Sequence, residues 1–163
     1  MAQKENNIIP MIFDEAFYRK MATQKWRQQD YKKAAEYYEK VLELSPKDFD
    51  IQQHYAQCLV KLNIGKKAER LFYENIVKDF HVAESFYELS QLNIELNEPN
   101  KAFLFGINYV ILSEDKDFRE MLEKTFEVTY TNEQKIELEA QLFSTQLLFQ
   151  FLFSQGRLEE ART

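Results

Sequence analysis

Few side chains of the types that perform catalysis or bind metals occur in this chain. The 163 residues contain two histidines, His54 and His81, and one cysteine, Cys58. The histidines lie 27 residues apart, and no second cysteine is present to complete a site with four ligands. A single cysteine cannot form a disulfide within the chain, and such a residue usually packs as a small apolar side chain. We therefore expect no metal site and no reactive thiol.

Short motifs of common enzyme and nucleotide-binding families are also missing. Gly65-Lys66 has no upstream glycine partner, so the sequence lacks a loop that could cradle a phosphate. Neither G-x-S-x-G nor H-E-x-x-H occurs. Glu159 and Glu160 are adjacent, which is typical of a solvated helix face. The sequence predicts a protein that is not an enzyme and binds no cofactor.

Composition and charge limit the class of partner and the setting. The net charge of −6 argues against nucleic acid, which is normally bound by basic domains. The N-terminal residues lack the apolar core of a signal peptide. The most apolar run, Leu142–Phe153, is about half the length of a membrane span. We expect a cytoplasmic protein without membrane insertion.

The spacing of apolar residues predicts an all-α fold. From Ile12 onward they recur every three or four residues, and polar breaks divide the chain into eight helical stretches and a terminal fragment. Glycine and proline occur three times each, which is too few for the turns of a many-stranded sheet. We expect a flexible extension over residues 1–10 and a single domain over residues 11–163.

A repeat of 34 residues organises most of this domain. The amphipathic stretch "DYKKAAEYYEKVLELSP", Asp30–Pro46, has echoes that place Ala34, Ala68 and Ala102 at this spacing, each after a lysine. The preceding stretches contain large–small pairs in the same phase: Met21-Ala22, Tyr55-Ala56 and Leu89-Ser90. Antiparallel helices approach closely where small side chains meet. The pattern predicts helical hairpins that cross at these residues.

This period and pattern resemble the tetratricopeptide repeat (TPR) family. The resemblance implies an α-α superhelix, a solenoid of antiparallel helix hairpins, with repeats over about residues 15–48, 49–82 and 83–116. The first repeat matches best, with Tyr18, Asp30-Tyr31 and Pro46 at family positions. The departures are Gln52 where an aromatic is usual, Phe80 where proline is usual, and Gly106 where an aromatic is common.

The C-terminal part does not keep the period. We expect an irregular helix pair over residues 117–141 and a partial repeat over residues 142–163. The sequence "RLEEA" resembles "YKKAA" and places Ala161 as a crossing alanine 59 residues after Ala102. A repeat that stops within a helix leaves its first helix uncovered. These features suggest the N-terminal part of a longer TPR array.

The resemblance also implies a binding groove, because the first helix of each TPR hairpin lines the concave side. The residues expected to point into this groove are Arg19, Lys20, Thr23, Arg27, Gln53, His54, Gln57, Lys61, Glu84, Tyr87, Glu88, Gln91 and Glu95. Their charge changes from basic to acidic along the chain. A chaperone-tail clamp is disfavoured, because Glu84 and Glu88 would repel a terminal carboxylate and His54 replaces an asparagine.

Three functions remain open from the sequence. The first is a scaffold or adaptor that binds a protein or extended peptide in the groove. The second is a receptor that senses a regulatory peptide, and the third is the non-catalytic N-terminal part of a larger enzyme or regulator.

The last long helix is expected to be apolar on all sides, and such a helix must be covered on more than one side. We expect self-association to a homodimer through Phe143, Leu147, Phe149, Phe151, Leu152 and Phe153.

Overall fold

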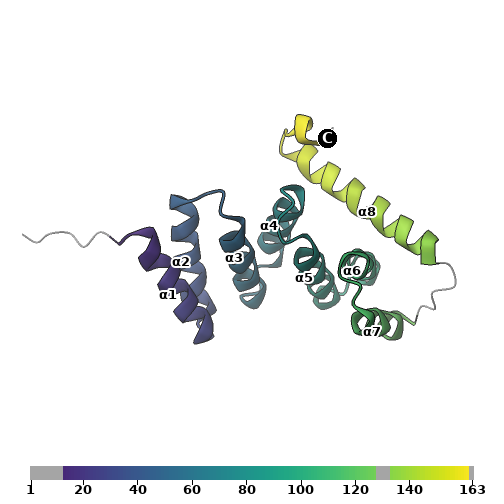
Figure 1. Ribbon diagram of the computed structural model, residues 1–163, viewed down its shortest axis with the longest axis horizontal. Coiled ribbons are helices and arrows are strands. Elements are labelled where there is room, and N and C mark those ends of the chain that lie inside the picture. The colour runs from purple at the N-terminus through teal and green to yellow at the C-terminus, as the bar shows by residue number, and fades with distance from the viewer. Residues whose placement is uncertain (1–12, 128–132, 162–163) are drawn as a thin grey trace, which may run out of the picture.

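The computed structural model describes residues 13–127 and 133–161, and the expected extension over residues 1–10 lies outside them. The described residues form nine helices and no strand, so the all-α prediction is confirmed. Figure 1 shows helices stacked side by side in chain order, as in a solenoid. The helices are α1 (Glu15–Arg27), α2 (Tyr31–Leu44), α3 (Phe49–Lys61), α4 (Gly65–Val77), α5 (Val82–Glu95), α6 (Pro99–Ser113), α7 (Lys116–Phe126), α8 (Glu133–Ser154) and α9 (Leu158–Ala161).

Aspartates fix the starts of four helices. The carboxylates of Asp14, Asp30, Asp48 and Asp115 each accept a hydrogen bond from the backbone N–H three residues later, at 2.9–3.2 Å. These bonds satisfy donors that the first turn of a helix otherwise leaves without a partner.

The turns inside the first three hairpins share one backbone geometry. Gln29, Asn63 and Asn97 have φ values of 59°, 60° and 57°, in the left-handed region. The next N–H in each turn donates to the carbonyl five residues before it, at 2.9–3.0 Å. This is the Schellman arrangement, which satisfies the last carbonyls of a helix. The turns therefore recur at the 34-residue spacing of the alanines.

The repeated small residues are fully buried. Ala34, Ala68 and Ala102 have no exposed surface, and the same holds for Ala22, Ala56 and Ser90 on the preceding helices. In the third hairpin the Ser90 hydroxyl donates to the carbonyl of Ala102 at 2.8 Å. Helices α5 and α6 therefore meet at this pair. The division of the chain into three repeats at the expected residue boundaries stays a prediction.

Gly106 is required by the packing of α7. A Cβ atom at this position would lie 2.6 and 2.8 Å from the two terminal carbons of Leu122 and 3.0 Å from Oγ of Ser90. Leu122 is fully buried. Glycine therefore stands where the repeat pattern would commonly have an aromatic, because a leucine from α7 fills its space.

Helix α8 reverses the direction of the array and packs against α6 and α4 (Figure 1). It is continuous, so the expected boundary at residue 142 falls inside a helix. Phe143 packs edge-on against Phe105 with ring centres 5.2 Å apart, and Phe151 against Tyr73 at 5.6 Å. Earlier helices thus cover one side of α8.

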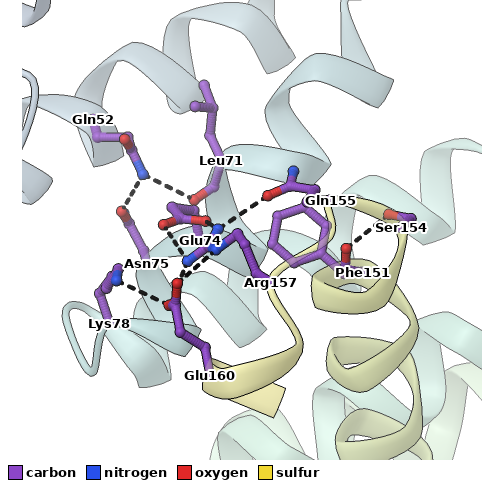
Figure 2. Close-up of polar contacts among 10 residues, drawn as sticks. All are labelled: Gln52, Leu71, Glu74, Asn75, Lys78, Phe151, Ser154, Gln155, Arg157 and Glu160. Carbon is purple, nitrogen blue, oxygen red and sulfur yellow. Dashed lines mark hydrogen bonds and ion pairs between the residues drawn. The ribbon is translucent and has the colours of Figure 1, made fainter.

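A cluster of charges fastens the C-terminal end of α8 and α9 to α4 (Figure 2). The Arg157 guanidinium donates to both carboxylate oxygens of Glu74, at 2.5 and 3.1 Å, and to those of Glu160, at 2.6 and 2.9 Å. Lys78 donates to Glu160 at 3.0 Å. We call Glu74, Lys78, Arg157 and Glu160 the C-terminal ion-pair cluster. It joins residues 83 positions apart in the sequence.

We expect Arg157→Ala to release α9 and the end of α8 from α4 without unfolding the first three hairpins. The side chains of Arg157 and Glu74 are each 22% exposed, which places their pairing between a surface ion pair and a buried one. Removing this pairing should lower the free energy of local opening by about 1–2 kcal/mol, so amides in the last turn of α8 should exchange about tenfold faster. Hydrogen exchange measures this change, and Arg70→Ala, an exposed position on α4, is the control.

Lowering the pH should also release α9 from α4. The pKa of Glu160 is lowered to about 2 by hydrogen bonds from Arg157 and Lys78. A carboxylate with a lowered pKa contributes stability above its unfolded pKa and loses it as the pH falls toward the folded value. The protection of α9 against exchange, taken relative to the intrinsic exchange rate at each pH, should therefore fall between about pH 4.5 and 2. If α9 is equally protected against hydrogen exchange in wild type and in Arg157→Ala at every pH, the C-terminal ion-pair cluster does not hold α9.

Candidate functional site

Two hollows are lined by the first helices of the three hairpins. One, of about 600 Å³, is open and is lined from α1 and its C-cap by Arg19, Lys20, Thr23, Gln24, Arg27 and Gln28. We call it the α1 hollow. The other, of about 310 Å³, is lined by residues of α1, α3 and α5: Trp26, Gln57, Val60, Lys61, Tyr87, Glu88, Gln91 and Glu95. We call it the interhelix pocket. Together they contain ten of the thirteen expected groove residues.

Glu88 forms the most buried charge of the interhelix pocket. Burial raises its pKa, whereas a hydrogen bond from Gln57 and the charge of Lys61 act in the opposite direction. Gln57 Nε2 donates to Glu88 Oε1 at 3.0 Å, which links α3 to α5. The pocket therefore presents a carboxylate that is partly removed from water.

Aromatic packing holds two walls of the interhelix pocket in place. The ring centre of Tyr87 lies 5.3 Å from those of both Tyr109 and Phe118. Trp26 packs edge-on against Tyr31 at 5.2 Å. Because neighbouring rings fix these side chains, the pocket offers apolar contact area without much loss of rotamer freedom on binding.

Arg19 has a structural role in addition to its place in the α1 hollow. It pairs with Glu15 at 2.5 Å and with Asp48, the residue that caps α3. These hydrogen bonds raise the pKa of Arg19. Burial alone would raise the pKa of Asp48, but Arg19 and the N–H of Ile51 hold it below its usual value. The exposed cations of this hollow are Lys20 and Arg27.

Gln53 was expected to point into the groove, but its side chain is buried. Its side chain is 4% exposed and its carbonyl oxygen accepts hydrogen bonds from Asn75 at 2.7 Å and Ser85 at 3.1 Å. Asn75 in turn accepts from Gln52 at 2.8 Å (Figure 2). Helices α4 and α5 therefore enclose this face of α3, and Gln53 belongs to a buried polar network.

The remaining two expected groove residues lie outside both hollows. His54 is exposed and stacks on Tyr38, with ring centres 5.9 Å apart. Glu84 is exposed on the first turn of α5.

Trp26 and Val60 line the interhelix pocket but were not expected from the sequence. Trp26 is the only tryptophan in the chain and directly precedes the expected groove residue Arg27. The signal that could have identified it is its residue type, since tryptophan is enriched among the residues that contribute most to binding.

The residues that could do other chemistry are placed as follows. Cys58 is fully buried, and burial raises the pKa of its thiol to about 12. His81 precedes α5 and pairs with Asp50. Within residues 13–127 and 133–161, no group of three histidine, cysteine or carboxylate side chains could hold a metal ion. In the same part of the chain, every helix is too short or too polar to cross a membrane.

Comparison with known proteins gives a family match over part of the chain and a fold. A family model described as tetratricopeptide repeat matches residues 25–72. No curated protein matches the sequence significantly. Among solved structures, the crystal structure of the MamA protein is similar, with a TM-score of 0.60, 18% sequence identity, and coverage of 90% of this chain and 85% of that chain. At this identity the structural match shows a shared fold.

Proposed function

We propose that this chain, which matches the tetratricopeptide-repeat family over residues 25–72, binds an extended peptide of a partner protein along α1, α3 and α5. Repeats of this family indicate a protein-interaction scaffold in general. The observation that carries the proposal is the interhelix pocket, which combines side chains from three hairpins with an aromatic wall and a half-buried carboxylate. Such a site can take a side chain of the bound peptide.

Charge along this surface defines the orientation of the proposed peptide. Lys20 and Arg27 are exposed on α1, whereas Glu84 and Glu95 are exposed on α5. A peptide with an acidic end over α1 and a basic end over α5 would meet complementary charge. Such complementarity acts mainly on orientation and association rate.

The charge reversal Lys20→Glu plus Arg27→Glu tests this proposal. Peptides selected from a random display library on the wild-type protein should share an acidic end. The double variant should bind them about tenfold more weakly, a difference of ~1.4 kcal/mol. The fluorescence of Trp26 reports binding, because it lines the interhelix pocket.

The matched control is Lys32→Glu plus Lys66→Glu, which reverses the same charge on exposed positions of α2 and α4. It should leave affinity unchanged apart from a small general electrostatic loss. If both double variants bind equally well, the peptide does not lie along α1.

We propose a non-catalytic role in the cytoplasm with a protein rather than nucleic acid as partner. The net charge of −6 supports the choice of partner. A single, fully buried thiol is compatible with a reducing compartment.

We also propose that the protein forms a homodimer through α8. The apolar side chains that α8 leaves exposed support this proposal. Of the six residues expected to mediate self-association, Phe149 and Phe153 are on the exposed side. The other four pack inward or are partly covered: Phe143, Leu147, Phe151 and Leu152.

A further inference from the structure

Helix α8 has an apolar stripe that the described residues leave uncovered. Leu138, Leu142, Phe149 and Phe153 are 56%, 60%, 48% and 61% exposed. At about 100° per residue these four positions fall within one narrow sector of the helix. We call them the outer face of α8. The opposite side of the helix packs against α4 and α6.

The spacing of these four residues is symmetric. Leu142 and Phe149 lie equally far from the midpoint between Thr145 and Gln146, and so do Leu138 and Phe153. A two-fold interface requires that residue i contacts residue j while j contacts i. If two copies of α8 run antiparallel about this midpoint, each leucine lies opposite a phenylalanine of the other copy. The outer face is thus complementary to itself.

The charge pattern permits the same arrangement. Residues 140–156 contain no charged side chain. Two antiparallel copies can therefore approach over the whole stripe without placing like charges opposite one another. A parallel pair would instead stack Phe149 and Phe153 on their own copies and bring Glu139, which borders the outer face, near the same residue of the partner.

We infer that two copies of this chain pair through antiparallel α8 helices, with a two-fold axis near Thr145 and Gln146. This inference rests on the proposed homodimer and specifies its register. Leu142 then packs on Phe149 of the partner subunit, and Leu138 packs on Phe153 of the partner subunit.

Association itself is tested by sedimentation equilibrium over a range of concentrations. Wild type should show a monomer–dimer equilibrium, and Leu142→Glu should weaken it at least a hundredfold, because the dimer contains two copies of the buried charge. Leu44→Glu, at a leucine 55% exposed on α2, is the matched control and should dimerise as wild type does. Unchanged circular dichroism shows that each variant is folded. A wild-type monomer at all concentrations would overturn both the homodimer and its register.

The register is tested with single cysteines and a short thiol cross-linker, since native Cys58 is fully buried. In the antiparallel pair Thr145→Cys lies near its own copy and should cross-link efficiently. Leu138→Cys lies about 22 Å along the axis from its own copy and should not. A mixture of Leu138→Cys and Phe153→Cys should cross-link between the two variants. Efficient self-linking of Leu138→Cys would overturn the antiparallel register while leaving the homodimer in place.

Discussion

Replacing Phe72 by alanine should lower the free energy of unfolding by about 3–5 kcal/mol. Phe72 lies on α4, is fully buried, and belongs to the core cluster that extends from α1 to α6. Removing its ring loses the transfer free energy of the buried carbons and leaves a cavity that rigid helices close only in part. Small globular proteins are stable by only about 5–15 kcal/mol, so this single change removes a large share.

Urea denaturation followed by circular dichroism measures this loss. Phe80→Ala is the control, because Phe80 is 46% exposed and stacks on Phe49 with ring centres 4.8 Å apart. The Phe80→Ala variant should lose about 1 kcal/mol of unfolding free energy, the contribution of one aromatic pair. If the two variants lose equal stability, the side chain of Phe72 does not hold the hairpins together.

Gly106→Leu should destabilise the protein by about 2–3 kcal/mol through overpacking against α7. Glycine costs about 1 kcal/mol in the middle of a helix, so the substitution would be favourable if space were available. Because Leu122 already occupies the space where a side chain would begin, both residues cannot fit. Thermal unfolding should show a lower midpoint together with the loss of α7 protection in hydrogen exchange.

A double-mutant cycle separates overpacking from other effects at this site. Leu122→Ala alone removes a fully buried side chain and should cost about 2–5 kcal/mol. In the double variant the leucine at position 106 fills the space that Leu122 leaves. The double variant should therefore be more stable than the sum of the two single losses predicts. Additive losses would show that the two positions do not share one space.

The helices, the turns and the crossing residues could be predicted because their signals are local and periodic. Asp30 and Asp48 cap helices through a backbone N–H three residues away. Ala34, Ala68 and Ala102 repeat at a fixed spacing, and their burial follows from the close approach of paired helices. A 3.6-residue period places each of these residues on a face without any knowledge of distant contacts.

The path of α8 could not be predicted, because it depends on contacts between distant segments. The sequence shows a helix with apolar residues on nearly every side, and no local signal tells which side faces the array. The pairing of Arg157 with Glu74 spans 83 residues. Gln53 was misplaced for the same reason, since Asn75 and Ser85 of two other helices decide that it is buried.

The candidate groove could be predicted in part. Lys61 and Gln91 line the interhelix pocket, and their role in binding stays a prediction. The resemblance assigns positions on a face, but it does not tell which side chains are already engaged. Arg19 was expected as a groove cation, yet it also joins α1 to the cap of α3.

The return of α8 onto α4 has a consequence for folding cooperativity. In an array of helical hairpins each unit contacts only its neighbours, so the ends can fray independently and folding can propagate from any point. The contact of α8 with α4 closes a long loop over α5, α6 and α7. Closing such a loop costs entropy and slows folding, but it couples the second hairpin to the last helix. Apart from the last turn of α8, the segment from α4 to α8 should therefore open as one unit, with protection that exceeds that of α1 and α2.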